Sequence, residues 1–157
     1  MFTNKFMFLD AALTTNNVWI GLTDLDAEGV VKWRSDNSTV LINHWNAGQP
    51  NNNGDGQHCV TTKYNGWIDK DCSASFPFLC QWINQSIETT IAPSPVHVPT
   101  SKCRNYFENS CFELVLELLS WSDAGQYCSE HYQGGHLAVV KSSRANDHLM
   151  SILEGEK

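Results

Sequence analysis

Six cysteines are the residues of this chain whose type and number point most clearly to chemistry. They fall into two groups of three: Cys59, Cys72 and Cys80, and then Cys103, Cys111 and Cys128. An even number of cysteines favours disulfide bonds and therefore an oxidising compartment. The sequence contains no Cys-x-x-Cys pair and no Cys/His knuckle, so it does not fit the common structural zinc sites. Spacing alone does not decide how these cysteines pair.

Histidine, serine and aspartate residues are present but do not form a catalytic pattern. His131 and His136 lie on either side of Gly134-Gly135, an arrangement that could hold a metal ion but is more typical of a turn. No Gly-x-Ser-x-Gly nucleophile motif occurs. We therefore predict a binding protein and not an enzyme.

Length and net charge limit the class of protein further. The chain has 157 residues, a length typical of one domain, and a formal net charge of −7. It contains no basic run, which argues against binding to nucleic acid or to an anionic membrane surface. No stretch approaches the length that a membrane-spanning helix requires. The six tryptophans favour a packed core rich in large rings.

Two kinds of sequence feature bear on the cellular compartment. N-glycosylation sequons begin at Asn37 and Asn84. Near the start of the chain, the apolar run at residues 6–9 is too short for the hydrophobic part of a signal peptide. We therefore expect an extracellular protein, either secreted or the ectodomain of a membrane protein, represented here by a piece without its own export signal.

The apolar pattern predicts the elements of the first part of the chain. Residues 4–13 have apolar positions at helical spacing. Strands are predicted at residues 18–22, 30–33, 59–62, 66–69 and 76–82. Residues 43–57 are a long polar stretch between the second and third of these strands, and a loop of this length indicates a functional segment.

A second set of elements follows a linker. Residues 84–101 are rich in Pro, Thr and Ser, which predicts an extended, semi-rigid linker. Beyond it we predict a strand at 112–114, a helix with Ser120 as its N-cap, a glycine turn entering a strand at 134–140, and a helix at 142–153. Residues 146–153 loosely resemble residues 4–13, and this small internal repeat indicates two tandem domains.

Motifs from both parts of the chain resemble those of the C-type lectin-like superfamily. They are Trp19-Ile20-Gly21-Leu22, Gln49-Pro50-Asn51, Trp67-Ile68-Asp69, Cys59…Cys72…Cys80 and Trp121…Ala124…Cys128…Gly135-His136-Leu137-Ala138. The resemblance implies an α+β fold in which two helices flank small antiparallel sheets, with a long irregular loop region.

The resemblance also implies that this fold is assembled in permuted order. Residues 1–83 resemble the C-terminal, long-loop half of such a domain, and residues 102–157 resemble the N-terminal half. The chain therefore resembles a fragment of a tandem C-type lectin-like protein, in which residues 84–101 are the linker between two domains.

A pairing of the cysteines follows from the same resemblance. The implied disulfides are Cys59–Cys72, Cys103–Cys111 and Cys80–Cys128. The last of these would join the two halves, so we predict that they close into one composite domain. A back half alone would expose a sheet edge, and a front half alone is too small to bury much of a core. In the parent protein, each half would pair with the missing half of its own domain.

The resemblance implies a place for the ligand as well. In sugar-binding members of the superfamily, a calcium ion held by carboxylate and amide oxygens bridges the protein and the sugar. The matching positions are Gln49, Asn51, Gln57, Ile68 and Asp69. Only Asp69 is a carboxylate and Ile68 provides no ligand, so we expect calcium binding here to be weak or absent. Trp45, beside the loop, is an aromatic residue that could face a ligand.

Three functions are consistent with these observations. The first, which we favour, is an extracellular recognition module that binds a carbohydrate or a protein without the usual calcium site and therefore without a cofactor. The second is a calcium-dependent carbohydrate-binding lectin with a degenerate Gln-Pro-Asn loop. The third is a structural or matrix protein, such as an ice- or mineral-binding protein, which would have no affinity for sugars.

Overall fold

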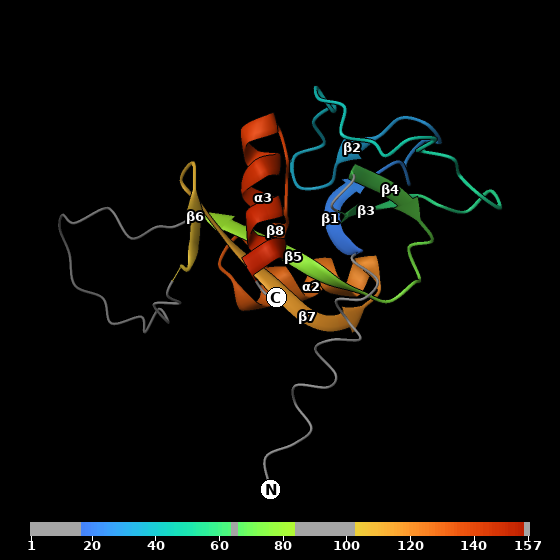
Figure 1. Ribbon diagram of the computed structural model, residues 1–157. Coiled ribbons are helices and arrows are strands. Elements are labelled where there is room, and N and C mark those ends of the chain that lie inside the picture. The colour runs from blue at the N-terminus through green and yellow to red at the C-terminus, as the bar shows by residue number, and fades with distance from the viewer. Residues whose placement is uncertain (1–16, 64–65, 84–102, 156–157) are drawn as a thin grey trace, which may run out of the picture.

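The computed structural model describes residues 17–63, 66–83 and 103–155 (Figure 1). The helix predicted at residues 4–13, the linker at 84–101 and the sequon at Asn84 lie outside the described residues. The described elements are β1 Val18–Thr23, β2 Lys32–Trp33, β3 Cys59–Lys63, β4 Gly66–Lys70, β5 Phe76–Ile83, β6 Asn105–Phe107, β7 Ser110–Leu119, α2 Trp121–His131, β8 His136–Leu137 and α3 Ser143–Gly155.

The eight strands of the described residues belong to one sheet. Its main path runs β4-β3-β1-β5-β7-β6, and the short strands β2 and β8 pair with β1 and β5. The α+β class predicted from the sequence is confirmed. The strands join into a single mixed sheet, whereas small antiparallel sheets were expected, because β5 pairs parallel with β1 on one side and antiparallel with β7 on the other.

The pairing of β5 with β7 joins strands from opposite sides of segment 84–102. The two strands run antiparallel, from Phe76 opposite Leu119 to Ile83 opposite Ser110. A ladder of this length fixes the register of the two parts of the chain, because a slip of one residue would turn every buried side chain to the wrong face. The two described parts of the chain therefore share one sheet.

Two buried indole rings add hydrogen bonds between the same two parts. Trp19 Nε1 donates to a carbonyl oxygen at the end of β7 at 3.0 Å, and Trp121 Nε1 donates to the Ile20 carbonyl oxygen at 2.8 Å. The chain at Gly21 passes so close to β8 that a Cβ atom there would lie 2.8 Å from the Leu137 carbonyl oxygen. A glycine at this position of the Trp-Ile-Gly-Leu motif thus allows the two parts to approach each other.

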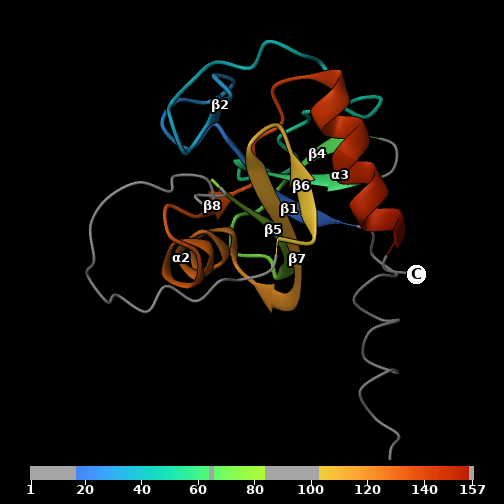
Figure 2. The same ribbon diagram turned by 90° about the vertical axis from the view of Figure 1, so that its left-hand side faces the viewer.

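Among the described residues, helices α2 and α3 cover opposite faces of the sheet (Figure 2). Because successive residues of a strand point to opposite faces, neighbours in β1 contact different helices. Trp19 belongs to the buried cluster that contains Ala124 and Cys128 of α2, and Ile20 belongs to the cluster that contains Leu149 of α3. Neither helix of the described residues is long and apolar enough to cross a membrane.

Helix starts agree with the sequence prediction better than strand lengths do. Ser120 caps α2, since its Oγ accepts a hydrogen bond from the Asp123 N–H at 3.2 Å. The strands β2 and β8 have only two residues each, although longer strands were predicted at 30–33 and 134–140. In contrast, β7 has ten residues where a strand was predicted at 112–114. Its pairing partner β5 sets this length, which local propensity does not reveal.

Three disulfide bonds link the described elements, and they are the pairs that the resemblance implies. Their Cα atoms are 5.1 Å apart in Cys59–Cys72, 5.4 Å apart in Cys80–Cys128 and 5.5 Å apart in Cys103–Cys111. These separations are ordinary for disulfides. Cys80–Cys128 ties the central strand β5 to α2, and so it joins the two parts of the chain covalently.

Candidate functional site

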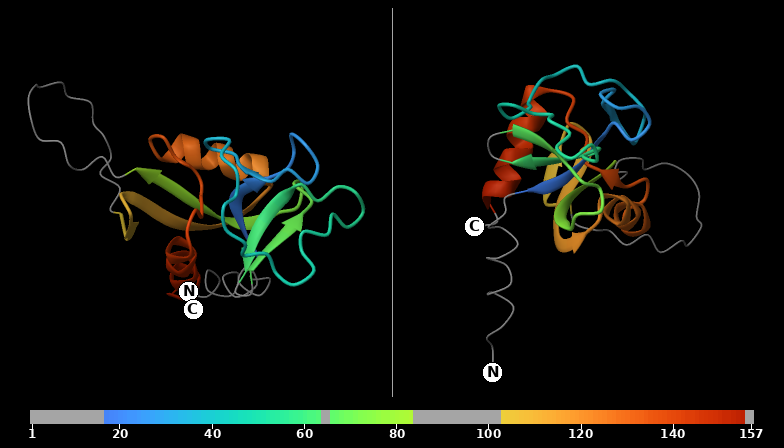
Figure 3. Two further views of the ribbon diagram at one scale, coloured as in Figure 1. Left: turned by 90° about the horizontal axis from the view of Figure 1, so that it is seen from above. Right: turned by 90° about the vertical axis from the view of Figure 1, so that its right-hand side faces the viewer.

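The chain between β2 and β3, residues 34–58, forms a long loop at one end of the molecule (Figure 3). Backbone hydrogen bonds fix its middle to β4: the Trp67 N–H donates to the His44 carbonyl oxygen at 2.7 Å, and the Asn46 N–H donates to the Trp67 carbonyl oxygen at 2.9 Å. Between these two bonds lies Trp45, half-buried, with its ring against the ring of Trp67 at a centroid distance of 5.9 Å. Trp45 therefore anchors the loop while the residue stays partly exposed.

Asp69 of β4 holds the next turn of the long loop. Its side chain is buried, and its Oδ2 accepts hydrogen bonds from the backbone N–H groups of Asn51 at 3.0 Å and Asn52 at 2.6 Å. The Gln49–Pro50 peptide bond immediately before these residues is cis. Charge-assisted hydrogen bonds of this kind are among the stronger ones in proteins. The structure thus brings together Asn51 and Asp69, which lie far apart in the sequence.

Other amide oxygens of the long loop also bind its own backbone. The Asn53 N–H donates to both Asn51 Oδ1 at 3.1 Å and Gln57 Oε1 at 3.0 Å. The Gln57 N–H donates to Asn52 Oδ1 at 2.9 Å. Asn51 and Gln57 are therefore neighbours, as the resemblance implied, but their side-chain oxygens act as hydrogen-bond acceptors that shape the loop.

Few side-chain oxygens at the calcium position are free of hydrogen bonds from the described residues. Calcium takes roughly six to eight oxygen ligands, several of them carboxylate. Two side-chain oxygens, Gln49 Oε1 and Asp69 Oδ1, are buried and accept no hydrogen bond from the described residues. The remaining acceptors are used within the loop, and Ile68 is buried and apolar. These two unpaired oxygens, one of which belongs to the single carboxylate Asp69, are fewer than the ligands that a calcium ion usually takes.

The other sequence candidates do not assemble into a site. His131 Nδ1 lies 2.9 Å from the Tyr127 carbonyl oxygen, and its ring stacks on Tyr127. His136 Nδ1 lies 2.8 Å from the Leu137 carbonyl oxygen. His131 ends α2 and His136 begins β8, and each ring contacts a nearby backbone carbonyl oxygen. Asn37 is exposed, which is the requirement for a glycosylated asparagine.

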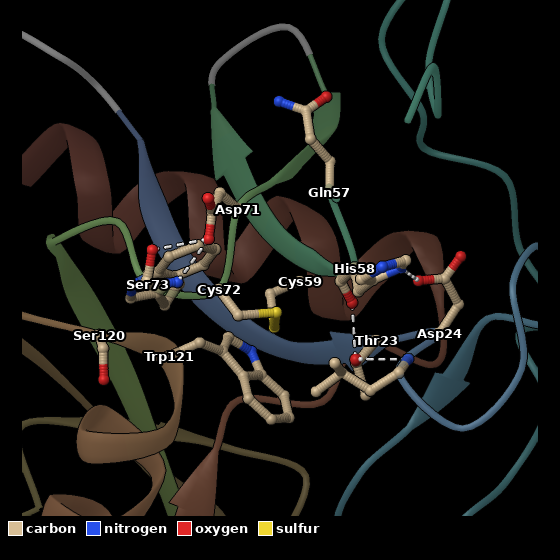
Figure 4. The surroundings of a disulfide bond; sticks show 12 residues. Thr23, Asp24, Gln57, His58, Cys59, Asp71, Cys72, Ser73, Ser120 and Trp121 are labelled. Carbon is tan, nitrogen blue, oxygen red and sulfur yellow. Dashed lines mark hydrogen bonds and ion pairs between the residues drawn. A yellow bond between two sulfur atoms is a disulfide. The ribbon is translucent and has the colours of Figure 1, made fainter. Parts of the chain in front are cut away.

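Sequence reasoning missed a group of ionisable side chains at the base of the long loop, of which Figure 4 shows Asp24 and His58. Asp24 and Glu28 follow β1, and His58 precedes β3. One ligand atom from each lies within 4.8 Å of the others. Asp24 and His58 are more than thirty positions apart, so only the paired strands β1 and β3 reveal that they meet. The available signal was that Asp24 lies two residues after one predicted strand and His58 directly precedes another.

Comparison with known sequences gives one family of matches. A family profile described as "Lectin C-type domain" matches residues 3–82. The chain is similar to "C-type mannose receptor 2" of Rattus norvegicus, with 31% identity over 143 residues, which are 86% of this chain and 9% of that protein. It is similar to the "Low affinity immunoglobulin epsilon Fc receptor" of Mus musculus, with 37% identity over 90 residues, 57% of this chain and 26% of that protein. The chain thus spans less than a tenth of the length of the mannose receptor that it matches.

Solved structures give partial matches. The "Mouse Scavenger Receptor C-type Lectin carbohydrate-recognition domain" has 33% sequence identity and a TM-score of 0.34, covering 46% of this chain and 62% of that chain. The C-type lectin CEL-I from Cucumaria echinata has 30% identity and a TM-score of 0.33, covering 36% of this chain and 41% of that chain.

Proposed function

The chain belongs to the C-type lectin family, and on that premise we propose that it is an extracellular, non-enzymatic recognition module. Its ligand is a carbohydrate or a protein, and binding occurs through the long loop without the usual calcium ion. The observation that carries this proposal is how the oxygens at the calcium position are used: Asp69 Oδ2 of β4 and the loop oxygens Asn51 Oδ1 and Gln57 Oε1 accept hydrogen bonds from the loop backbone. A loop shaped by such bonds does not depend on a metal for its conformation.

Exposed groups of the same loop would make the contacts with a ligand. Asn51 and Asn53 are exposed, and their amide groups can donate and accept hydrogen bonds with hydroxyl or backbone groups. The half-buried ring of Trp45 offers an apolar face of the kind that packs on sugars or anchors protein contacts. Recognition by amides and an aromatic ring suits a neutral ligand better than a charged one.

A specific observation supports calcium-dependent sugar binding as the second candidate. Gln49 Oε1 and Asp69 Oδ1 are buried without hydrogen-bond partners among the described residues, and such oxygens are costly to leave unpaired. A cation, or a ligand group that donates a hydrogen bond, is the kind of partner that such an oxygen lacks. If the protein binds its ligand without calcium, a hydroxyl or amide group of the ligand donates these hydrogen bonds.

Binding to a glycan array, with calcium and with a chelator, distinguishes the two candidates. We expect binding that the chelator does not change, and a melting temperature that calcium does not raise. Asn51→Ala should weaken binding, whereas Gln133→Ala, an exposed position outside the long loop, serves as the matched control. A calcium-dependent rise in melting temperature that Asp69→Ala abolishes would establish the second candidate. Absence of any glycan or protein ligand would favour the structural or matrix role.

We further propose that the chain is a segment of a tandem array, cut so that it holds parts of two neighbouring domains. The match to the mannose receptor extends over 143 residues, which is longer than the region 1–83 or the region 102–157 alone. A continuous match across both regions supports their order in the parent protein. The mass and domain count of the full-length transcript product test this proposal.

A further inference from the structure

A cavity of about 500 Å³ lies between helix α2, strand β8 and the turns that follow β1 and β2. Its apolar wall is formed by Trp121 and Gly125 of α2, Leu137 of β8 and Leu25 of the turn after β1. Leu25 is half exposed, so this wall is open to solvent on one side. A volume of this size is typical of sites that bind small molecules. The long-loop residues proposed above as ligand contacts are not among those that line it.

Hydrogen bonds to the core fix Trp121, the largest side chain of this wall. Its backbone N–H donates to the Cys72 carbonyl oxygen at 3.0 Å, and its ring Nε1 donates to the Ile20 carbonyl oxygen at 2.8 Å. Figure 4 shows the ring beside Cys72. Because the only polar atom of the ring is already paired within the protein, Trp121 offers the cavity a fixed and purely apolar surface.

Gly125 lies in the middle of α2, where glycine is less favourable than alanine because it loses more backbone freedom on folding. Packing does not require glycine there. Apart from the backbone of the helix itself, a Cβ atom would have one described neighbour within 4 Å, a side-chain carbon of Leu137 at 3.9 Å. Gly135 differs, because a Cβ atom there would lie 2.2 Å from the Cys128 carbonyl oxygen. The missing side chain of Gly125 therefore enlarges the cavity without being needed by the fold.

The charge at the cavity is opposite to that of the whole chain. The chain has a formal net charge of −7, yet the described residues that line the cavity include no Asp or Glu, and Arg34 is the one that is always positive. The Arg34 N–H donates to the Gly21 carbonyl oxygen at 2.8 Å, which holds the residue beside the cavity. Its guanidinium is 62% exposed and lies 3.7 Å from the Asp26 carboxylate, and a pair this exposed contributes little. Arg34 can therefore bind an acidic group of a ligand.

We propose that this cavity binds a small amphipathic carboxylate of the fatty-acid type. The apolar chain of the ligand lies against Trp121 and Gly125, and its carboxylate pairs with Arg34 where the cavity opens to solvent. The exposed hydroxyl of Ser122 provides a further hydrogen-bond donor. The cavity is separate from the contacts proposed for the long loop, so binding here is independent of the function proposed above.

Displacement of the dye anilinonaphthalene sulfonate from the whole, oxidised chain tests the site. The dye has apolar rings and one anionic group, so we expect one equivalent to bind and to become fluorescent. Decanoate should displace it at a lower concentration than decanol, the matched ligand without a charge. Gly125→Leu, which fills the cavity, should weaken the binding of the dye and of decanoate by roughly tenfold or more. Gly155→Leu is the matched control, because Gly155 ends α3 outside the cavity and a Cβ atom there meets no described atom within 4 Å.

A second variant separates the role of charge from that of shape. Arg34→Gln should weaken decanoate binding by about threefold, the scale of an exposed ion pair, and leave decanol binding unchanged. Arg144→Gln is its control, because Arg144 of α3 is 80% exposed and does not line the cavity.

Three results would overturn the proposal. Equal decanoate affinity in the wild type and in a cooperatively melting Gly125→Leu variant would show that the ligand binds elsewhere. An equal loss of decanoate and decanol binding in Arg34→Gln would show that the carboxylate is not recognised, and this comparison decides alone if Gly125→Leu does not fold. Absence of saturable binding by a cooperatively melting wild-type chain would show that the cavity holds only solvent.

Discussion

The buried carboxylate of Asp69 stabilises the conformation of the long loop. Its two backbone hydrogen bonds come from consecutive residues, Asn51 and Asn52, and hold a turn that would otherwise have unpaired N–H groups. The carboxylate is nearly inaccessible to water. Loss of this side chain therefore removes two charge-assisted bonds and leaves two donors without partners.

We predict that Asp69→Ala destabilises the protein by roughly 2–4 kcal/mol, because buried bonds to a charged acceptor are worth more than neutral ones. Urea unfolding followed by tryptophan fluorescence measures the loss. Asp55→Asn is the control, because Asp55 is exposed in the same loop and asparagine tolerates its φ of 55°; this change should alter the stability by less than about 0.5 kcal/mol. Equal stability of the Asp69 and Asp55 variants would contradict the structural role of Asp69.

Family resemblance implied that certain loop residues lie together, while their role in ligand binding stays a prediction. The resemblance implied that Asn51, Gln57 and Asp69 lie at one site, and in the structure they are neighbours. The sequence could not show that the Asn53 N–H would bind two of their oxygens, because the path of the loop backbone decides which donors are near. Long-range contacts such as that of Asp24 with His58 were hidden for the same reason.

At the scale of elements, α3 packs on the β6–β7 hairpin through a histidine. The ring of His148 stacks on Phe107 at a centroid distance of 4.8 Å and meets the edge of Phe112 at 5.6 Å. Its Nε2 is buried and has no hydrogen-bond partner among the described residues. Burial lowers the pKa of His148 below its ordinary value, since the charged ring would lose its hydration. Nearby, Arg144 lies over the Phe107 ring.

The stability of the protein should therefore fall as the pH is lowered from about 7 to about 5. The unfolded chain, in which a histidine has a pKa of about 6.5, binds a proton that folded His148 resists. This contribution to the free energy of unfolding is fully present above the unfolded-state pKa of about 6.5. It is lost as the pH falls from there toward the lower pKa of His148 in the folded protein. Melting temperatures across this range measure the effect, with His148→Phe as the comparison. A variant with the same pH slope as the wild type would show that His148 is not responsible.

Element positions were largely predictable from the sequence, because apolar periodicity and the Ser120 cap mark them. The lengths of the strands were less predictable than their positions. The ten residues of β7 end in Leu-Glu-Leu-Leu, which gives no alternation that distinguishes a strand from a helix. Its extent follows from β5, and a strand that is paired along its length needs little propensity of its own.

At the scale of the whole molecule, the two parts of the chain depend on each other. Strand β5 lies in the middle of the sheet, and without β7 its edge would be open. Helix α2 would lose Trp19 and Phe78, the rings that cover its buried face. The disulfide Cys80–Cys128 then fixes an arrangement that packing and strand pairing already favour. Neither part alone has the contacts of a complete core.

We predict that separately produced fragments 1–83 and 84–157 refold together into one species and do not fold alone. Under oxidising conditions they should become linked, because Cys80 and Cys128 lie on different fragments while the other two disulfides are each internal to one fragment. A single band at the combined mass on a non-reducing gel, with two bands after reduction, measures this.

Cys128→Ser should abolish the covalent link and lower the stability of the complex by roughly 2–5 kcal/mol, yet leave some non-covalent association through β5 and β7. Independent cooperative unfolding of either fragment would show that each part is a domain by itself.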